Sequence, residues 1–244
     1  HLFGEEGETN KVIFLKINDR QGEDKIENKE RLHIERAIGS EMKGDFDLHN
    51  PEQFFAIAPY QQRWYFGTYT KSEPIWFNHI KKPKEYSTAL STRVARAVAN
   101  IAVPHPSGVR AIDPCCGIGT VLVEARSMDI DIVGRDINPL VCIGSRENLA
   151  YFGLTGQVEK GAIQDIEEAY DVAIIDLPYN LYTHASWEEQ LTILKHAKRI
   201  AKRVVIVTIE SMDDRLESIG LHIKDRCITT KQQFEREILV CESK

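Results

Sequence analysis

Residues 111–120, AIDPCCGIGT, combine an acid, two glycines and a threonine where an apolar strand is expected to run into a helix. Asp113 ends the strand, Gly117 and Gly119 lie in the following loop, and Thr120 opens the helix. Glycines let a ligand approach the backbone closely, and the first turn of a helix offers free N–H groups with a partial positive charge. In a parallel sheet, ligands bind beyond the carboxyl ends of the strands, so this loop predicts a binding site.

The residues around the two glycines indicate what kind of ligand this loop would take. A dinucleotide site needs a small residue three positions after Gly119, where this chain has Leu122, and the lysine-containing phosphate loop is absent. The carboxylate of Asp113 repels an anion and favours a cation. S-adenosylmethionine carries a sulfonium and an ammonium group and therefore fits this charge. The alternative is a plain Asp–Pro turn in which the glycines serve tight packing.

A second acid, Asp136, ends the next expected strand in the motif GRDINP. It lies about 20 residues beyond the glycine loop, where an acidic side chain binds ribose hydroxyls in nucleotide-binding α/β folds. The alternative is that Asp136 caps the following helix, which Asn138 and Pro139 are expected to begin.

A third acid, Asp176, follows a fully apolar strand and opens the motif DLPYN. Exocyclic amines of nucleobases are poor nucleophiles, because their lone pair is delocalised into the ring. The Asp176 carboxylate and the backbone carbonyl of Leu177 could accept the hydrogens of such an amine and hold it towards an electrophile. Pro178 would make the loop rigid, and Tyr179 would offer a face on which a base can stack. The alternative is an ordinary Pro–Tyr turn.

The elements that must position these residues alternate regularly after residue 80. We expect strands at 109–113, 130–136, 157–163, 170–176 and 203–209, and helices at 88–102, 120–128, 139–152, 187–201 and 212–219. Two further strands, at 223–229 and 236–242, are expected to form a C-terminal antiparallel hairpin. Alternation of strands and helices predicts an α/β fold, a doubly wound Rossmann-like sheet with helices on both faces.

The first 79 residues are expected to form a small α+β segment, and residues 80–244 the main domain. The small segment has strands predicted at 11–17, 54–58 and 63–68 and a helix at 31–42. So few residues make a marginal core, and we expect the segment to pack on the main domain.

Composition excludes several classes of protein. Of the 244 residues, 42% are hydrophobic and 28% charged, which is typical of globular chains, and no apolar run is long enough to span a membrane. We expect no signal peptide, and the start at His1 instead of Met suggests a fragment or a processed chain. Five cysteines without a paired spacing predict free thiols, a cytoplasmic location and no zinc site. His79 and His105 are expected to be isolated loop residues, with no bound metal.

A net charge of −6 argues against coating of nucleic acid by bulk charge. Residues 78–110 nevertheless contain six Lys or Arg against one acid, Glu85. This stretch is either a surface that faces RNA or an ordinary solvated helix and linker. The six cations are Lys81, Lys82, Lys84, Arg93, Arg96 and Arg110.

The motifs DPCCGIGT, GRDINP and DLPYN together resemble those of class I S-adenosylmethionine-dependent amino-methyltransferases, most closely the tRNA guanosine-N2 methyltransferases associated with THUMP domains. The resemblance covers residues 80–244 well. Upstream, KGDFDLHNPEQFFAIAPYQQRWYFG is similar to the end of a THUMP domain, which implies that residues 1–79 are a partial or degenerate THUMP-like segment.

The resemblance implies roles for individual residues of this chain. The methionine end of the cofactor would be held by Asp113 and the glycine loop, which includes Cys115, Gly117, Gly119 and Thr120. The ribose would be bound by Asp136, and Ile137 would pack on the adenine. The target amine would be held by Asp176, Leu177, Pro178 and Tyr179.

Two positions depart from the family pattern. In GAIQDI, Ala162 stands where the family usually has an acid that binds the adenine amino group, and Asp165 would be a displaced substitute. Leu177 replaces the first proline of the common D-P-P-Y motif, which keeps the backbone carbonyl but removes rigidity.

The resemblance implies transfer of a methyl group from S-adenosylmethionine to an exocyclic amine of a nucleobase, with guanine N2 in tRNA first and guanosine-10 as family precedent. The expected partner is RNA, together with a protein partner or an RNA-binding region outside this chain. One alternative is a DNA adenine or cytosine amino-methyltransferase, although no long target-recognition insertion is visible. Another is a cofactor-binding module without catalysis. An NAD-dependent dehydrogenase is disfavoured by Leu122 and by DLPYN.

Overall fold

The computed structural model consists of two compact units, His1–Glu73 and Pro74–Lys244, and each is considered by itself. The division falls a few residues before the domain boundary expected at 79/80, because the chain from Pro74 onward already packs with the second unit. The residues described are 4, 6–17, 26–60, 62–85, 89–177, 186–231 and 234–243. Within these ranges, no helix combines the length and the apolar character that a membrane crossing requires.

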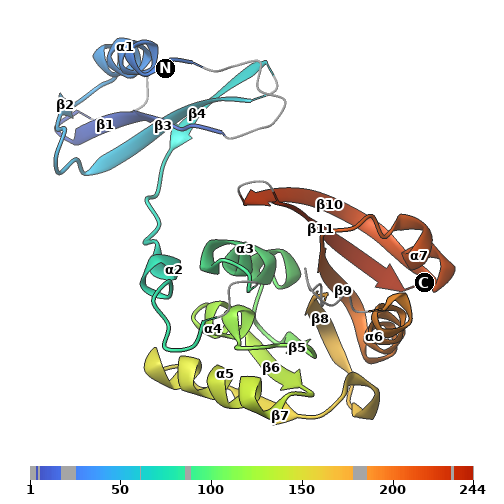
Figure 1. Ribbon diagram of the computed structural model, residues 1–244. Coiled ribbons are helices and arrows are strands. Elements are labelled where there is room, and N and C mark those ends of the chain that lie inside the picture. Colours follow the sequence, from blue (N-terminus) through green and yellow to red (C-terminus); the bar gives the residue numbers. More distant parts are fainter. Residues whose placement is uncertain are drawn as a thin grey trace. The chain divides into compact units, whose positions relative to one another are not determined.

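The first unit is a four-stranded sheet in the order β2-β1-β3-β4 with one helix against it (Figure 1). Its elements are β1 (Thr9–Phe14), α1 (Asn28–Ser40), β2 (Asp45–Phe46), β3 (Gln53–Tyr60) and β4 (Arg63–Thr68). Side chains of α1 pack on the sheet, where Val12, Phe55 and Ile57 form a small core. The helix and the three longer strands lie where the hydrophobic pattern predicted them, whereas the two-residue strand β2 was not predicted.

The second unit is a seven-stranded sheet in the order β10-β11-β9-β8-β5-β6-β7. Its strands are β5 (Arg110–Asp113), β6 (Asp131–Asp136), β7 (Gln157–Lys160), β8 (Tyr170–Asp176), β9 (Ala201–Thr208), β10 (Leu221–Lys231) and β11 (Phe234–Ser243). Its helices are α2 (Ile75–Asn78), α3 (Thr92–Ala102), α4 (Thr120–Arg126), α5 (Pro139–Tyr151), α6 (Trp187–Ile200) and α7 (Asp213–Ser218). Strands β5 to β9 are parallel and β10 and β11 are antiparallel, which confirms the predicted doubly wound sheet with a terminal hairpin.

Helices cover both faces of this sheet (Figure 1). Strand β8 shows why: Val172 and Ile174 enter the core shared with α3, α4 and α5, whereas Ala173 and Ile175 enter the core shared with α6 and α7. A strand buried on both faces reads as a continuous apolar run, which is the pattern that predicted it. Helix α6 starts where a capping box holds it, since Ser186 Oγ accepts the Glu189 N–H and Glu189 accepts the Ser186 N–H.

Doubly wound sheets have a ligand crevice where the strand order reverses, and here the order reverses between β5 and β8. From β5 the chain moves outward through β6 to β7, then returns to β8 on the other side of β5. Ligands of doubly wound sheets bind at such a reversal, beyond the carboxyl ends of the strands. Asp113 is the last residue of β5 and Asp176 the last residue of β8, so both acids lie at this point.

One predicted strand was too long. Residues 157–163 were expected to be a strand, but β7 ends at Lys160, and Ile163–Asp165 form the short 3₁₀ helix η1. The ladder ends where the Gly161 N–H donates to the Asp136 carbonyl and the Asp165 N–H turns back to the Ala162 carbonyl. Ile163 is apolar because it is buried in the core on the α6 side, and not because it continues the strand.

The turn after α2 contributes His79 to a buried ionic cluster with side chains of α3 and α4. His79 Nδ1 lies 2.8 Å from Glu124 Oε1, and Arg96 Nη1 lies 3.1 Å from Glu124 Oε2, while the Glu124 side chain has no exposed surface. Arg96 also donates to Ser127 Oγ, at 2.9 Å. His79 was expected to be an isolated loop residue, and this was wrong: its ring is buried and packs on Phe152.

We predict that Glu124→Gln lowers the free energy of unfolding of the second unit by roughly 3 kcal/mol, as expected when one partner of a buried ion pair is removed. The matched control is Glu147→Gln, which removes the half-exposed partner of Lys84 and should change stability by less than about 1 kcal/mol. Urea unfolding of the two variants measures both values. Equal shifts of the two midpoints would contradict the role given to Glu124.

Candidate functional site

The glycine loop between β5 and α4 is held by backbone hydrogen bonds. The Cys116 N–H donates to the Arg135 carbonyl and the Gly119 N–H to the Cys116 carbonyl, at 3.0 and 2.8 Å. Gly117 and Gly119 have φ values of +53° and +76°, in the left-handed region that favours glycine. A Cβ on Gly119 would meet Ser145 Oγ at 2.1 Å, whereas a Cβ on Gly117 would meet nothing within 4 Å. Gly119 therefore serves packing, and open space adjoins Gly117.

Asp136, at the end of β6, is bonded to the glycine loop. Its Oδ2 accepts the Gly117 N–H at 3.0 Å, and its Oδ1 accepts the Asn138 N–H at 2.9 Å. The side chain that caps α5 is that of Asn138, which accepts the Leu140 N–H. Each oxygen of Asp136 accepts one backbone N–H and keeps a second lone pair for another donor.

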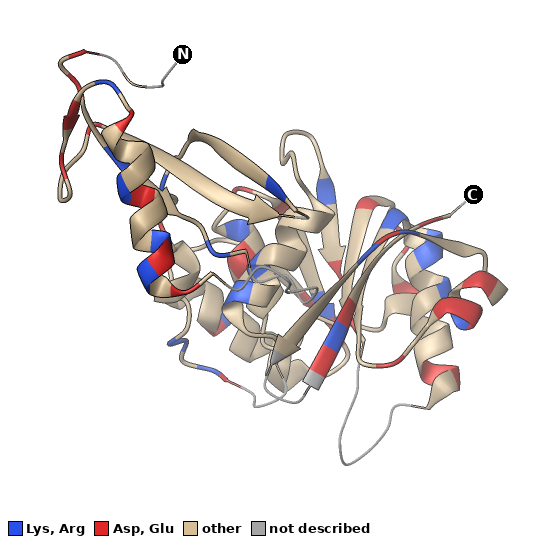
Figure 2. Cartoon of the chain, turned by 90° about the horizontal axis from the view of Figure 1, so that it is seen from above, with Lys and Arg blue, Asp and Glu red and all other residues tan. Residues whose placement is uncertain are grey.

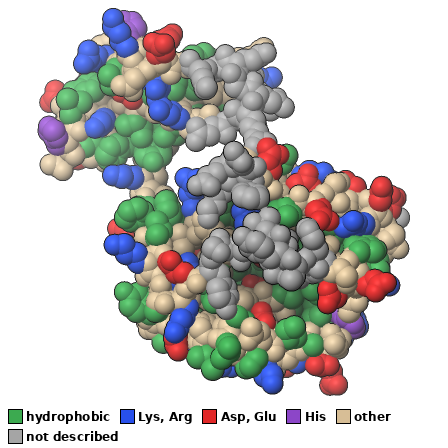
Figure 3. Space-filling model, viewed as in Figure 1, with side chains coloured by type: hydrophobic (Ala, Val, Ile, Leu, Met, Phe, Trp, Pro, Cys, Tyr) green, Lys and Arg blue, Asp and Glu red, His purple; other side chains and the backbone are tan. Residues whose placement is uncertain are grey.

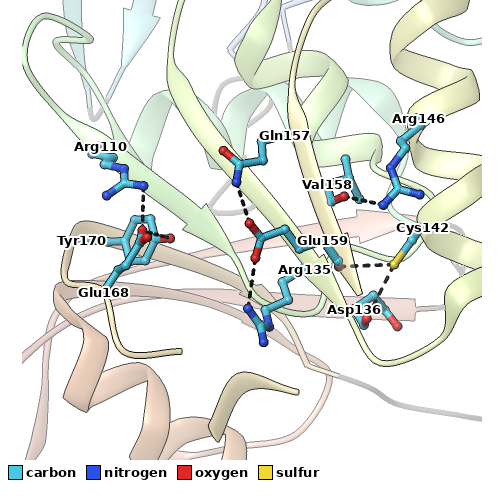
Figure 4. A network of polar contacts seen from close by, with 10 residues as sticks. All are labelled: Arg110, Arg135, Asp136, Cys142, Arg146, Gln157, Val158, Glu159, Glu168 and Tyr170. Atoms are coloured by element: carbon cyan, nitrogen blue, oxygen red, sulfur yellow. Dashed lines mark hydrogen bonds and ion pairs between the residues drawn. The ribbon is translucent and has the colours of Figure 1, made fainter. Parts of the chain in front are cut away.

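The backbone of Asp136 is fixed as well. Figure 4 shows the Cys142 thiol donating to the carbonyls of Asp136 and Glu159, which ties α5 to the ends of β6 and β7. In the same view Glu159 accepts from Gln157 and pairs with Arg135. These contacts brace the edge of the sheet at which Asp136 lies.

Two acids at the reversal of strand order have raised pKa values. Asp113 is only 3% exposed, and burial together with the negative charges of Asp176 and Asp136 raises its pKa well above the usual range, although the Cys115 N–H bonded to its Oδ1 opposes this. Burial also raises the pKa of Asp176 to about 7, against the opposing charge of Arg236. Concentrating carboxylates in a buried crevice is unfavourable unless a cation or donor compensates them.

Several polar atoms near this crevice lack partners. In the part of the chain that the structure describes, Asp176 Oδ1, Thr120 Oγ1 and Ser145 Oγ are buried without a hydrogen-bond partner. Buried polar groups are almost always bonded in native proteins, so unpaired groups beside a ligand crevice indicate where a ligand would donate or accept. Over the same described ranges, no group of His, Cys, Asp or Glu is arranged to hold a metal ion.

The other expected site residues have different surroundings. Ile137 is 70% exposed and lies just before α5, a helix that carries further exposed apolar side chains. Figure 3 shows hydrophobic side chains in green along the lower part of the second unit, where α5 runs. Asp165 is exposed on η1, just past the end of β7. Leu177 is buried and its N–H donates to the Val207 carbonyl, which continues the pairing of β8. Pro178 and Tyr179 lie outside the described residues.

The basic stretch 78–110 does not form one free surface. Arg96 belongs to the buried cluster with Glu124, and Lys84 pairs with Glu147. Arg110, the first residue of β5, lies at the end of the strand opposite Asp113, where it pairs with Glu168 and stacks on Tyr170 (Figure 4). Figure 2 shows basic and acidic residues interspersed over both units.

Sequence reasoning missed two residues near the site. The Asn148 side chain accepts the Lys84 N–H and donates to the carbonyls of Lys84 and Ile118, so it ties the segment before α3 to the glycine loop. Arg236 is buried near Asp176. The available signal for Arg236 was its spacing in the strand. It lies two residues before Ile238 and four before Val240, both of which face the core.

Comparisons with known proteins identify relatives by sequence. A tRNA (guanine(10)-N2)-dimethyltransferase of Methanothermobacter thermautotrophicus is 33% identical over 112 residues, which cover 45% of this chain and 33% of the relative. The mouse U6 snRNA (guanine-N(2))-methyltransferase THUMPD2 is 34% identical over 100 residues, 38% of this chain and 19% of the relative. The matched segment thus spans a third or less of the length of these curated relatives.

Solved structures show the same fold. TrmN from Thermus thermophilus has a TM-score of 0.57 at 18% identity, covering 98% of this chain and 73% of TrmN. Magnesium protoporphyrin IX methyltransferase from Synechocystis, solved with bound S-adenosylmethionine, has a TM-score of 0.53 at 14% identity, covering 69% of this chain and 90% of that enzyme. The sequence pattern of the RMKL-like methyltransferase domain matches residues 80–232, well over half of the chain, and the protein therefore belongs to this methyltransferase family.

Proposed function

We propose that the second unit transfers a methyl group from S-adenosylmethionine to an exocyclic amine of a nucleobase, with guanine N2 in tRNA as the first substrate. The observation that carries the proposal is the buried, unpaired Oδ1 of Asp176 at the reversal of strand order, next to the buried carboxylate of Asp113. Family membership and the names of the curated relatives support the reaction and the target atom.

The residues present fit S-adenosylmethionine. The buried Asp113 and the partly buried Asp176 call for a positively charged ligand, and the open space beside Gly117 leaves room for it. Asp113 and the glycine loop would hold the methionine end, with the unpaired Thr120 hydroxyl as a further contact. The free lone pairs of Asp136 suit ribose hydroxyls. When bound, the cofactor supplies a methyl group on a positively charged sulfur.

Further contacts to the cofactor come from two exposed residues. Ile137 lies directly after Asp136 and is available to cover the adenine. Asp165 is exposed on η1 and would bind the adenine amino group in place of the acid that Ala162 replaces. Cys115 contributes through its backbone, because its N–H fixes the carboxylate of Asp113.

Asp176 would accept hydrogens of the target amine and orient its lone pair. Good alignment of two reactants can supply about 7–11 kcal/mol of the barrier reduction, so positioning is the main task of the site. Because burial raises the pKa of Asp176 to about 7, its accepting form is lost as the pH falls below neutral. The carbonyl of Leu177 would take a second hydrogen, while Pro178 and Tyr179 would make the loop rigid and stack on the base. A base must leave its stack to enter such a site, which costs a few kcal/mol.

RNA is the proposed macromolecular substrate, because the curated relatives are named for tRNA and U6 snRNA. We propose that residues 1–79 are a partial or degenerate THUMP-like segment, and that either a protein partner or an RNA-binding region outside this chain completes the contact with RNA. The free thiols of all five cysteines suit a cytoplasmic location.

We predict that Asp176→Ala lowers the rate of methyl transfer to tRNA transcript by about a hundredfold or more, because the group that orients the amine is lost. Binding of S-adenosylmethionine, measured by calorimetry, should remain. The matched control is Asp171→Ala, at the other end of β8, where the exposed carboxylate pairs with Lys202. Full activity of the Asp176 variant would refute the assignment. Binding without methyl transfer by the unchanged protein would indicate a cofactor-binding module.

We predict that Asp113→Asn stabilises the ligand-free protein at pH 8 and leaves its stability unchanged below about pH 4. The folded state raises the pKa of Asp113, so the unfavourable buried charge grows as pH rises from the usual aspartate value through the raised one. An asparagine removes that charge and still accepts the Cys115 N–H. Thermal unfolding at the two pH values measures the effect, because each kcal/mol of stability shifts the Tm by about 2–4 °C.

The same variant should bind S-adenosylmethionine about tenfold more weakly or worse at pH 8, because it loses one charge-assisted contact with the cofactor. Asp131→Asn, on the exposed end of β6, is the control for both measurements. Unchanged affinity in the Asp113 variant would contradict its contact with the cofactor, and a fall in stability at pH 8 would contradict the cost assigned to its burial.

A further inference from the structure

The C-terminal hairpin carries a buried cation. Arg236 of β11 is 9% exposed, and among the residues whose burial is described no other Lys or Arg is classed as buried. Burying a guanidinium is unfavourable unless an acid or an acceptor compensates it.

Strand register places Arg236 at the edge of the sheet where Asp176 lies. Asp176 pairs with Val207 of β9, and Val207 pairs with Ile238 of β11. Because β11 runs antiparallel to β8 and β9, residues that precede Ile238 lie towards the carboxyl ends of those strands. Arg236 comes two residues before Ile238. It therefore lies beyond the paired residues Asp176, Val207 and Ile238, at the edge of the sheet where the strand order reverses.

The side chains also share one face of the sheet. Ile174, Val207 and Ile238 all belong to the core beneath α3, α4 and α5. Alternate residues of a strand point to the same face, so Asp176 lies on the face of Ile174, and Arg236 on the face of Ile238. Strand β9 separates β8 from β11, so their backbones are roughly 10 Å apart, a gap that a long arginine side chain can largely span.

Titratable groups face Asp176 from three segments, and the Cys115 thiol among them is uncharged, because burial and the neighbouring acids raise its pKa. Asp113 faces it from β5 and Cys115 from the loop after β5, whereas Arg236 faces it from β11. Among the described residues, Arg236 supplies the cationic charge that acts on Asp176, and it opposes the effect of burial on the pKa of that carboxyl. Asp113 cannot serve this purpose, because its own carboxylate repels that of Asp176.

We propose that Arg236 is a positioning residue that keeps the Asp176 carboxylate ionised and ready to accept the target amine, which makes the hairpin part of the active site. The proposal rests on the methyl transfer proposed above, because only that reaction gives Asp176 an amine to hold. In this role Arg236 acts on the Asp176 carboxylate and not on the cofactor. Its loss should therefore alter the pH dependence of methyl transfer and leave cofactor affinity intact.

The test compares the full chain with Arg236→Gln and Arg236→Lys, with Arg226→Gln as control, since Arg226 lies on β10 of the same hairpin and pairs with Asp213 and Glu237. A carbon-13 NMR titration follows the Asp176 carboxyl directly. We expect its midpoint to rise by about 1–3 pH units in Arg236→Gln, to be largely restored in Arg236→Lys, and to stay unchanged in the control. An unchanged midpoint in Arg236→Gln overturns the proposal.

Activity provides the second measurement. The acid limb of the pH profile for methyl transfer should move with the NMR midpoint, and a shift of one unit lowers the rate at pH 7 by roughly fivefold. The dissociation constant for S-adenosylmethionine should not change. If the unchanged protein methylates no RNA, the proposed function fails while the titration still tests Arg236. If methylation occurs and the acid limb does not move in Arg236→Gln, the role of Arg236 fails alone.

A double-mutant cycle of Arg236→Gln and Asp176→Asn keeps the test decisive if Arg236→Gln is unstable. The coupling in unfolding free energy should be present at pH 8, where Asp176 is ionised, and should be largely lost at pH 5, below the value of about 7 to which burial raises its pKa. A coupling that is absent at pH 8, or equal at the two pH values, overturns the proposal.

Discussion

The order of the strands in the second unit constrains two acids to lie together at one point of the sheet. Asp113 and Asp176 end neighbouring parallel strands, so the strand order brings their carboxylates close to one another. Such an arrangement is unfavourable unless a cation or hydrogen-bond donors compensate the charges. The backbone bonds of the glycine loop, the lone pairs of Asp136 and the charge of Arg236 all act on this one place.

The surrounding fold supplies the rigidity that the crevice needs. Each acid ends a strand that is hydrogen-bonded on both sides, and Cys142 holds the backbone of Asp136 from α5. Gly119 allows α4 and α5 to come so close that Ser145 occupies the space of a missing Cβ. A site assembled from strand ends and helix starts is therefore fixed by the same packing that stabilises the core.

Most of the fold, and the ends of the strands that carry the three acids, could be predicted from local patterns. Strand β8 is apolar on both faces and was predicted with its observed bounds, and Asp113, Asp136 and Asp176 were placed at strand ends by the residues beside them. The predictions that failed depend on partners distant in the sequence. Ile163 resembled a strand residue because it fills the core below η1, and His79 resembled a loop residue because its partner Glu124 lies 45 positions away.

The effect of Arg236 on Asp176 could not be predicted either, because it also depends on residues that are distant in the sequence. The alternation of β11 could have indicated that Arg236 faces the core, but nothing local indicates that β9 is the strand between β11 and β8. Only the completed strand order brings the charge to the acid. The fold class was therefore predictable from periodicity, whereas the electrostatic surroundings of the site required the three-dimensional arrangement.

The contacts of His79 and Asn148 have a consequence for where the methyltransferase unit begins. His79 is bonded to Glu124 of α4, and the backbone of Lys84 is held by Asn148, which also holds the glycine loop at Ile118. A shortened protein that began at residue 80, where the family match starts, would leave Glu124 without its histidine. One that began at Pro74 would retain the contacts of His79 and of Lys84, so the stretch from Pro74 to Lys84 is structurally part of the second unit and not a passive tether.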